Sequence, residues 1–343
     1  MKQIEIDKYD KDKMIDVIKN LYLHIEHSFE IISNSSLEKR NNIKNILICG
    51  MGGSAIGGDF VKTVLKDELK VPITVNRDYD LPSWVTNKTL VLICSYSGNT
   101  EETISCYNST ISNKIKPIII SSGGYILNDA KNNNFDYVQL PPGIQPRAAF
   151  GYSASLLLLT FVKIGLINKI YSKQLFDSID SIKSNSLRHA SLSKDNDCLN
   201  LANAIYNKFP IIYCTVNTEV VGFRFRCQLA ENSKILSSHF ILPEQNHNEI
   251  EGFSNNDTSN YAIIWIKDEN DNKQTLKRVD ITSTLLNKVE NQYVFSDKSN
   301  SLVERLFNLI YLFDWVSFYC AIYHQTNPTP VNTILKLKSL MSK

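Results

Sequence analysis

The sequence predicts an α/β protein of two domains, each built on an open parallel sheet. At 343 residues the chain has the length of two such domains. Short runs rich in β-branched residues alternate with stretches of helical periodicity, which is typical of βαβ units and a parallel sheet. This alternation occurs twice, on either side of a Ser-, Lys- and Asn-rich stretch over residues 172–197.

The first half of the chain predicts a leading helix followed by five strands. Apolar residues from Met14 to Ile25 recur at helical intervals before an Asn- and Ser-rich loop, so we expect a helical segment over residues 1–40. Another helical pattern runs from Ala148 to about Ile170. The predicted strands of the first sheet are Ile46–Cys49, Ile73–Asn76, Leu90–Cys94, Pro117–Ile120 and Tyr137–Leu140.

The second half repeats the pattern with four strands. They are predicted at Ile211–Thr215, Ser238–Leu242, Ala262–Ile266 and Tyr293–Ser296, with helices near Thr218–Lys234, Lys273–Lys288 and Leu302–Tyr323. We therefore predict four parts. They are an N-terminal helical segment (1–40), a first sheet domain (41–170), a junction with interrupted helices (171–200) and a second sheet domain that includes a C-terminal helix (201–343).

Composition excludes several classes of protein. The 37 basic and 35 acidic residues give a net charge of +2 without a dense Lys/Arg block, so nucleic acid is not an expected partner. The apolar runs look shorter than the roughly 18 residues that span a bilayer, so we expect no membrane partner. The seven cysteines lack C-x-x-C spacing and the N-terminus is charged rather than signal-like. We expect buried thiols and a cytoplasmic protein.

A glycine-rich turn follows the first predicted strand. It reads GMGGSAIGGD over residues 50–59 and leads into a helix. Such a turn lets a ligand contact the backbone at a helix N-terminus, so Gly52, Gly53 and Ser54 are candidate binding residues. Dinucleotide sites have similar turns, but the spacing here does not match G-x-G-x-x-G followed by an acidic residue about 20 positions later.

A second turn, SYSGNTEET, follows the third predicted strand. Its hydroxyl side chains, Ser95, Ser97 and Thr100, converge where the free N–H groups of a helix start would point. Ordinary helix capping would explain Asn99 with Glu102, but not three hydroxyls around a glycine. The turn lacks the Gly-Lys-Ser/Thr ending of an ATP-binding loop. We predict that it binds the phosphate of a small molecule.

Six strings in order carry a resemblance to a known family. They are GMGGSAIGGD, SYSGNTEET, QPRAA, QLAENSK, NHNEIEG and PTPV-x-x-I-x-x-LK, spread from Gly50 to Lys338. The chain resembles the bifunctional phosphoglucose/phosphomannose isomerases over nearly its whole length. The resemblance implies two sugar isomerase (SIS) domains, each a parallel-sheet αβα sandwich, and a homodimer without metal or organic cofactor. It also implies interconversion of glucose 6-phosphate or mannose 6-phosphate with fructose 6-phosphate through a cis-enediol.

The same resemblance implies the roles of two residues in the second domain. Glu231 matches the base that moves a proton between C2 and C1, a task that suits a carboxylate. His247, 16 positions later, matches the histidine that opens the sugar ring and reaches the site of the neighbouring subunit. Glu244 and Glu249 are nearby carboxylates that rank behind Glu231 as candidates for the base. An alternative role for Glu249 is to orient His247.

Three further residues are implied. Arg147 matches an arginine that stabilises the enediolate charge. Lys338 matches a lysine that acts in ring opening or binds substrate hydroxyls, with Lys336 as the alternative. Thr329 matches the threonine that leaves room for rotation about C2–C3 and so allows both epimers. The C-terminal helix has Ile334, Leu337 and Leu340 at helical spacing, and we expect it to dock on the body of the protein.

Two other functions remain open at this point. One is a different phosphosugar isomerase or an aldolase-like enzyme on the same domains. The other is a regulator that binds a sugar phosphate without turnover, but such regulators usually have a basic helix-turn-helix segment, and the first 45 residues show none. The presence of Glu231, His247 and Arg147 together favours an enzyme.

Overall fold

The computed structural model describes residues 1–341, which form two compact units. The five-stranded unit contains Asn20–Ser181 and Ser301–Glu304. The four-stranded unit contains Met1–Lys19, Ile182–Asn300 and the chain from Arg305 onward. The domain boundaries predicted near residues 40, 170 and 200 stay predictions.

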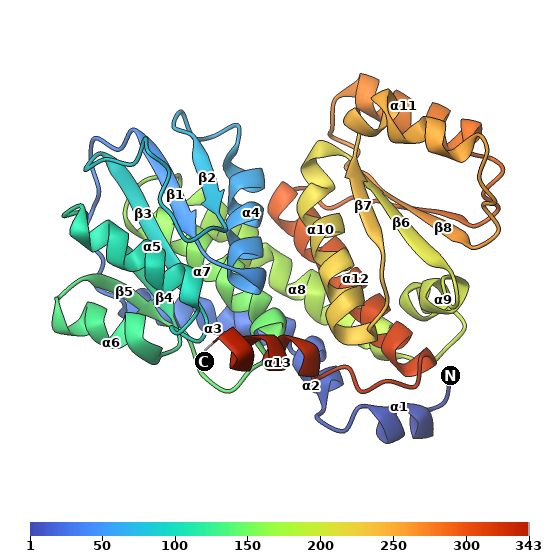
Figure 1. The fold of residues 1–343 in the computed structure, drawn as a ribbon, viewed down its shortest axis with the longest axis horizontal. Helices are drawn as coiled ribbons and strands as arrows, with labels where there is room; N and C mark the ends of the chain where they lie inside the picture. The colour runs from blue at the N-terminus through green and yellow to red at the C-terminus, as the bar shows by residue number, and fades with distance from the viewer. Residues whose placement is uncertain (342–343) are drawn as a thin grey trace. The chain divides into compact units, whose positions relative to one another are not determined.

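The five-stranded unit has an entirely parallel sheet with the order β2-β1-β3-β4-β5 (Figure 1). Its central strands β1 and β3 are almost fully buried, as their β-branched composition predicts. The predicted parallel α/β sheet is therefore confirmed. The strands are β1 (Asn45–Cys49), β2 (Ile73–Asn76), β3 (Thr89–Ser95), β4 (Ile118–Ser121) and β5 (Asp136–Gln139).

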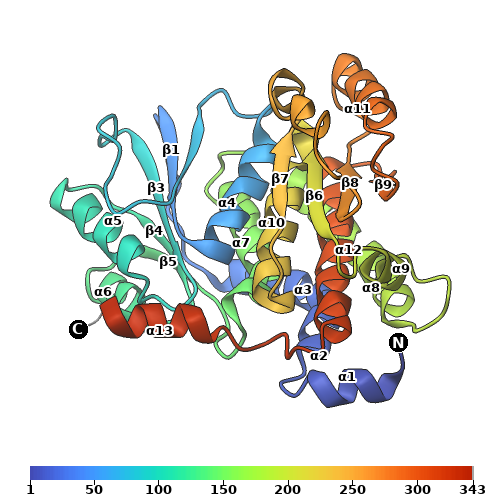
Figure 2. The same cartoon turned by 45° about the vertical axis from the view of Figure 1, so that its right-hand side comes forward.

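Helices cover both faces of this sheet (Figure 2). Leu47, Val91 and Ile119 face a core that α5 (Glu101–Ser112) and α6 (Gly124–Asn132) complete. On the other face, Gly58 brings α4 against β1, where a Cβ would lie 3.1 Å from Ile48 Cγ2. The helices of that face are α4 (Gly52–Leu65), α7 (Phe150–Lys163) and α3 (Leu21–Asn34). The unit is an αβα sandwich.

The four-stranded unit is a second sandwich with the parallel order β7-β6-β8-β9. Tyr213 and Trp265 face the core under α11 (Lys273–Leu285). Gly222 brings α10 (Glu219–Gln228) against the opposite face, beside the side chains of Ile212 and Cys214. The strands are β6 (Phe209–Cys214), β7 (Ser238–Ile241), β8 (Tyr261–Ile266) and β9 (Gln292–Phe295).

Helix α12 (Leu302–Tyr323) corrects one expectation. Among the described residues it is the one helix long and apolar enough to cross a membrane, although the sequence was expected to contain no such stretch. In the folded chain 89% of its most apolar window is buried. Asp314, near the middle of the helix, forms a bidentate ion pair with Arg224 of α10, at 2.9 Å and 2.7 Å. The helix has the composition of a core element with one paired charge.

The N-terminal segment is three helices rather than one leading helix. They are α1 (Gln3–Tyr9), α2 (Met14–Lys19) and α3. Asp10 ends the first and caps the second, because its carboxylate accepts from the backbone N–H groups of Met14 and Ile15 at 2.8 Å and 2.9 Å. Conversely, the Ser- and Asn-rich junction forms one continuous 21-residue helix, α8 (Ile170–Ala190), followed by α9 (Asp197–Ala204).

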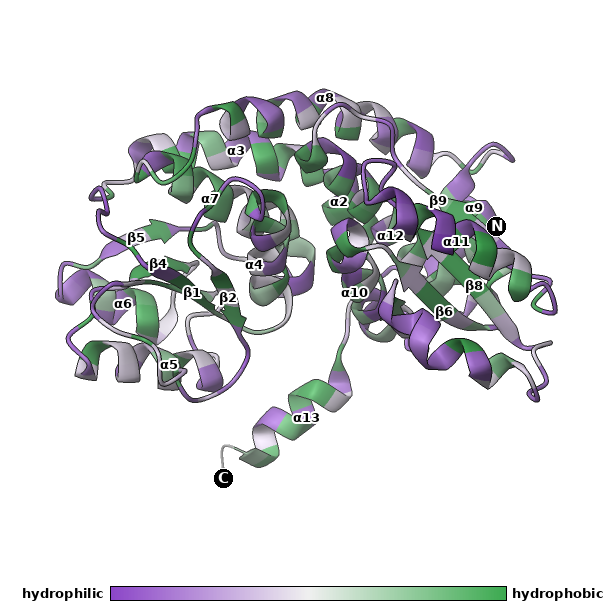
Figure 3. Ribbon diagram, turned by 90° about the horizontal axis from the view of Figure 1, so that it is seen from above, coloured by the Kyte–Doolittle hydropathy of each residue, from purple (hydrophilic) through white to green (hydrophobic). Residues whose placement is uncertain are grey.

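The C-terminal helix α13 (Asn332–Met341) is present, but the predicted docking is not observed. None of its residues is buried, and Ile334, Leu337 and Leu340 are 40–58% exposed. Apolar and polar residues follow one another along the helix (Figure 3). Helical spacing of apolar residues predicts an apolar face, but it does not determine whether that face is covered.

Loss of the buried ion pair is expected to destabilise the four-stranded unit strongly. Arg224→Met leaves the Asp314 carboxylate buried without its bidentate partner, which costs about 3–5 kcal/mol of unfolding free energy. Chemical denaturation measures this loss. Lys173→Met, which removes an exposed pair with Asp177, is the control and should cost less than about 1 kcal/mol. Equal losses for the two variants would contradict the expectation.

Candidate functional site

The first glycine turn of the five-stranded unit lies against Arg147. It connects β1 to α4, and Gly52 at its start has φ +50°, a conformation that glycine adopts without strain. A Cβ on Gly53 would lie 2.7 Å from the carbonyl oxygen of Pro146, so only glycine fits there. Arg147, 5% exposed, lies in the short 3₁₀ helix η1 (Pro146–Ala149). The structure therefore brings two of the predicted site segments together.

The second turn, SYSGNTEET over residues 95–103, connects β3 to α5 and is called the hydroxyl turn below. Hydrogen bonds within the turn fix its shape. Ser95 Oγ donates to Thr100 Oγ1 at 3.0 Å and accepts from the N–H of Gly98 at 3.1 Å. Ser97 Oγ accepts from the N–H of Asn99 at 3.2 Å. Ser95 is buried, whereas Ser97 is exposed and Thr100 is half-buried. Ser95 therefore shapes the turn, and Ser97 and Thr100 are the hydroxyls that a ligand can reach.

The two turns meet at one edge of the sheet. The backbone N–H of Tyr96 donates to Ser54 Oγ at 3.3 Å, which joins the hydroxyl turn to the start of α4. Gly98 has φ +66°, and a Cβ there would lie 1.8 Å from the carbonyl oxygen of Gly123. Since β1 and β3 are parallel neighbours, the N-termini of α4 and α5 lie at the same edge. Two helix N-termini with nearby hydroxyls are well suited to an anion such as a phosphate.

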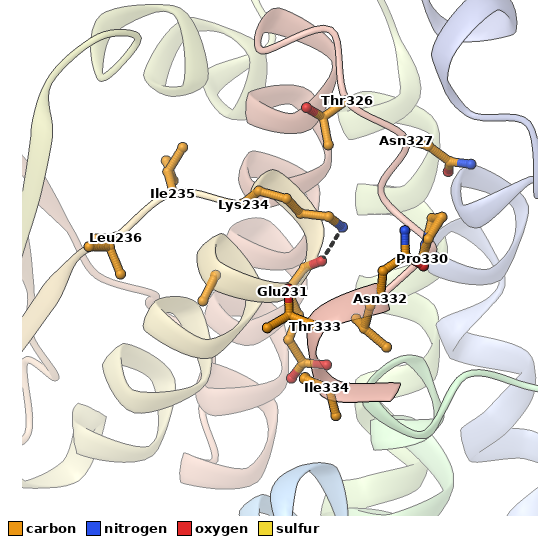
Figure 4. Close-up of a pocket in the computed structure, with 12 residues that line it drawn as sticks. Glu231, Lys234, Ile235, Leu236, Thr326, Asn327, Pro330, Asn332, Thr333 and Ile334 are labelled. Carbon is orange, nitrogen blue, oxygen red and sulfur yellow. Dashed lines mark hydrogen bonds between the residues drawn. The ribbon is translucent and has the colours of Figure 1, made fainter. Parts of the chain in front are cut away.

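In the four-stranded unit, Glu231 lies in a short π-helix, η3 (Leu229–Ser233), that continues α10. Single π-helical turns often occur at functional sites. Glu231 is half-buried and lines a cavity of about 660 Å³, within the usual range for small-molecule sites (Figure 4). The cavity is lined by Ala230, Glu231, Lys234, Ile235, Leu236, Thr326, Asn327, Pro330, Val331, Asn332, Thr333 and Ile334.

A seam of buried hydrogen bonds holds the π-helical turn against α12. Asn232 Nδ2 donates to Ser317 Oγ at 3.0 Å, and Ser233 Oγ donates to the Ser317 carbonyl at 2.6 Å. One turn earlier, Gln228 Nε2 donates to the Asp314 carboxylate at 3.1 Å. The residues after Glu231 are thus anchored, while Glu231 itself lines the cavity.

His247 and Glu249 lie on consecutive 3₁₀ turns, η4 (Glu244–His247) and η5 (Glu249–Phe253). His247 is exposed and is not among the residues that line the cavity. Burial raises the pKa of Glu249 to about 7, and the nearby Tyr213 hydroxyl partly opposes that rise.

The segment between α12 and α13 forms the second wall of the cavity. Thr329 lies within this segment, where its N–H donates to Asn327 Oδ1 at 3.1 Å. Lys336 and Lys338 are exposed on α13 outside the cavity lining, so the choice between them stays open. Sequence reasoning missed Lys234, which lines the cavity beside Glu231. A single lysine in a left-handed conformation leaves no periodic signal in the sequence.

Metal binding has no visible basis in the described part of the chain. Residues 1–341 contain no group of three or more His, Cys, Asp or Glu side chains that could hold an ion.

Comparison of the sequence with known proteins identifies close relatives. A family model described as the bacterial phospho-glucose isomerase C-terminal SIS domain matches residues 194–341. The bifunctional phosphoglucose/phosphomannose isomerase of Caldicellulosiruptor bescii is 39% identical over 342 residues, covering 96% of this chain and 99% of the relative. The enzyme of the same name from Aquifex aeolicus is 35% identical, covering 88% of this chain and 91% of the relative.

Solved structures with the same fold are more distant in sequence. A hypothetical protein from Thermus thermophilus has a TM-score of 0.74 at 12% identity, covering 98% of this chain and 93% of that one. The C-terminal domain of glucosamine-fructose-6-phosphate aminotransferase from Francisella tularensis has a TM-score of 0.67 at 16% identity, covering 92% and 98%. These similarities establish the tandem SIS-like fold.

Glu249 is expected to make stability depend on pH near neutrality. Its pKa is about 7 in the folded chain and roughly 4.3 when unfolded. The folded state therefore binds more protons in this interval, and its stability falls as pH rises from about 4 to 7. Glu249→Gln removes this loss, so at pH 8 the variant should gain on the order of 2 kcal/mol relative to its difference from wild type at pH 4.

Denaturant unfolding across this pH range measures the effect. Glu244→Gln, at an exposed position of the same segment, is the control and should follow the wild-type pH dependence. A Glu249→Gln profile parallel to the wild-type profile would show that the Glu249 carboxyl is not shifted.

Proposed function

Because the chain belongs to the bifunctional phosphoglucose/phosphomannose isomerase family, we propose that it interconverts glucose 6-phosphate and mannose 6-phosphate with fructose 6-phosphate. The observation that carries this proposal is Glu231, a carboxylate fixed on a π-helical turn in the lining of a cavity of about 660 Å³. The names of the relatives indicate the substrates, and the cavity provides room for a small molecule.

In this proposal, Glu231 is the base of the isomerisation. Its carboxylate takes the proton from C2 of the open-chain aldose, the electron pair forms the C1–C2 double bond, and the C1 carbonyl oxygen takes up a proton from water. The protonated Glu231 then returns its proton to C1 of the cis-enediol, while the C2 hydroxyl releases its proton to water and becomes the carbonyl of the ketose. No atoms are gained or lost. The buried bonds of Asn232 and Ser233 support this role by holding the turn that carries the base.

The phosphate group is proposed to bind at the two turns of the five-stranded unit. The N-termini of α4 and α5 supply backbone N–H groups, and Ser54, Ser97 and Thr100 supply hydroxyls. Gly52, whose Cβ position is open, allows the phosphate to approach the backbone closely, and Gly53 is proposed to contribute through its backbone while it packs against Pro146. Ser95 contributes indirectly, through its hydrogen bonds to Gly98 and Thr100.

Charge stabilisation and ring opening are assigned to residues in both units. Arg147 is proposed to stabilise the enediolate oxygens, a role that its fixed charge suits. His247 is proposed to open the ring in the site of a second subunit, and the enzyme is therefore proposed to be a homodimer. The exposed position of His247 supports a role in the site of a neighbouring subunit. Lys338, or Lys336, is proposed to contact substrate hydroxyls. Thr329 is proposed to leave room for both epimers.

We also propose that the enzyme works in the cytoplasm. All seven cysteines are free thiols, and six of them are buried. Unpaired cysteines of this kind are typical of a reducing compartment.

Removal of the Glu231 carboxylate is expected to abolish turnover while binding persists. Purified protein is given fructose 6-phosphate, and coupled assays follow glucose 6-phosphate and mannose 6-phosphate separately. Wild type should form both products, and Glu231→Gln should lower kcat by about 10²–10⁴-fold, since proton transfer loses its base. Glu269→Gln, at an exposed position, is the control. If wild type binds fructose 6-phosphate but forms neither product, a non-catalytic sugar-phosphate-binding protein replaces the proposal.

Mixing two inactive variants is expected to restore activity if His247 acts across a dimer. In a heterodimer of Glu231→Gln and His247→Ala, one site receives an intact Glu231 from one subunit and an intact His247 from the other. With random exchange, activity should recover to about a quarter of wild type. No recovery, with exchange verified by size and tag, would place both residues of a site on one subunit.

A further inference from the structure

A lysine ends the turn that carries Glu231, in a backbone conformation that lysine seldom adopts. Lys234 has φ 58° and ψ 32°, in the left-handed region. This conformation costs a residue with a side chain roughly 1–2 kcal/mol, and helices usually place glycine or asparagine there. A compensating interaction is therefore expected at Lys234.

The Lys234 ammonium makes that interaction. Its Nζ donates to the carbonyl of Glu231 at 2.5 Å (Figure 4). It also donates to the carbonyl of Asn232 at 3.4 Å. These carbonyls lie at the C-terminal end of the π-helical turn, where the helix dipole favours a cation. The same Nζ donates at 3.3 Å to the carbonyl of Pro328, in the segment between α12 and α13.

The lysine therefore connects the two walls of one cavity. Glu231 and Lys234 belong to the first wall, and residues 326–334 form much of the second. Asn327 holds the second wall independently, because its Nδ2 donates to Asp12 at 2.7 Å while its Oδ1 accepts from the N–H of Thr329. A change at Lys234 would thus release one wall from the other without removing the remaining supports of either.

We propose that Lys234 is a positioning residue that sets the ratio of glucose 6-phosphate to mannose 6-phosphate formed from fructose 6-phosphate. The inference rests on the proposed function. The ammonium contacts backbone carbonyls of the segments that contain Glu231 and Thr329, so it acts through those residues. Protonation of C2 from opposite faces of the enediol gives the two epimers. A shift of one wall relative to the other changes the two protonations unequally.

The test compares Lys234→Gly, Lys234→Arg and a matched control. Lys234→Gly removes the ammonium and also relieves the backbone strain, so it should fold. We expect its kcat with fructose 6-phosphate to fall about tenfold with KM within about twofold, and its product ratio to change at least about threefold. Lys234→Arg, which keeps a cation, should recover part of both. Lys208→Met, which removes an ammonium bonded at 2.7 Å to the Ser259 carbonyl outside the cavity lining, should change neither.

The product ratio separates positioning from a structural role. Unfolded or inactive molecules form no product, so the ratio is independent of the active fraction. A Lys234→Gly protein that loses kcat but keeps the wild-type ratio has only a structural defect, and one that keeps both is unaffected. Either result overturns the inference while the isomerase function stands. Wild-type protein that forms neither product overturns the proposed function, and this inference with it.

Discussion

The bidentate ion pair between Arg224 and Asp314 is the interaction on which the four-stranded unit depends. Both side chains are almost completely buried, at 2% and 3% exposure. Two charges in such surroundings are tolerated only when each compensates the other and the remaining hydrogen bonds are satisfied. Gln228 supplies one of these bonds, to the same carboxylate. The pair thereby fixes the rotation of α10 against α12. Because the π-helical turn η3 continues α10, its orientation is fixed as well.

Glu231 benefits from this rigidity without taking part in it. The bonds from Asn232 and Ser233 to Ser317 continue the seam beyond the ion pair, so the backbone at the proposed base is fixed on its buried side. A catalytic group must be held within a fraction of an ångström of its working geometry, and a scaffold of helices does this better than a loop. The same turn leaves Glu231 half-buried at the cavity.

The sequence predicts what depends on local patterns and misses what depends on distant partners. Nine strands in two parallel sheets were predicted and are found within residues 1–341, and the buried strands among them, such as β1, β3 and β8, follow from runs rich in β-branched residues, whose burial needs no knowledge of a specific contact. The hydrophobic character of α12 was missed because Asp314 interrupts its apolar run, and Asp314 is buried only because Arg224, 90 positions away, pairs with it. The left-handed Lys234 depends likewise on Pro328. The prediction that α13 docks on the body of the protein was wrong, because the periodicity of apolar residues does not specify a partner.

The two units are assembled from the chain in different ways, and this affects how the protein is made. Nearly all of the five-stranded unit comes from one continuous stretch, so it can fold while synthesis continues. The four-stranded unit instead needs the first 19 residues together with those after position 181. The carbonyl of Lys19 accepts from Ser186 and Tyr311, and Asp12 accepts from Asn327. Helices α1 and α2 are therefore synthesised long before partners that lie some 170 to 315 positions later, so Ile6, Met14 and Ile18 stay exposed until those partners have been made.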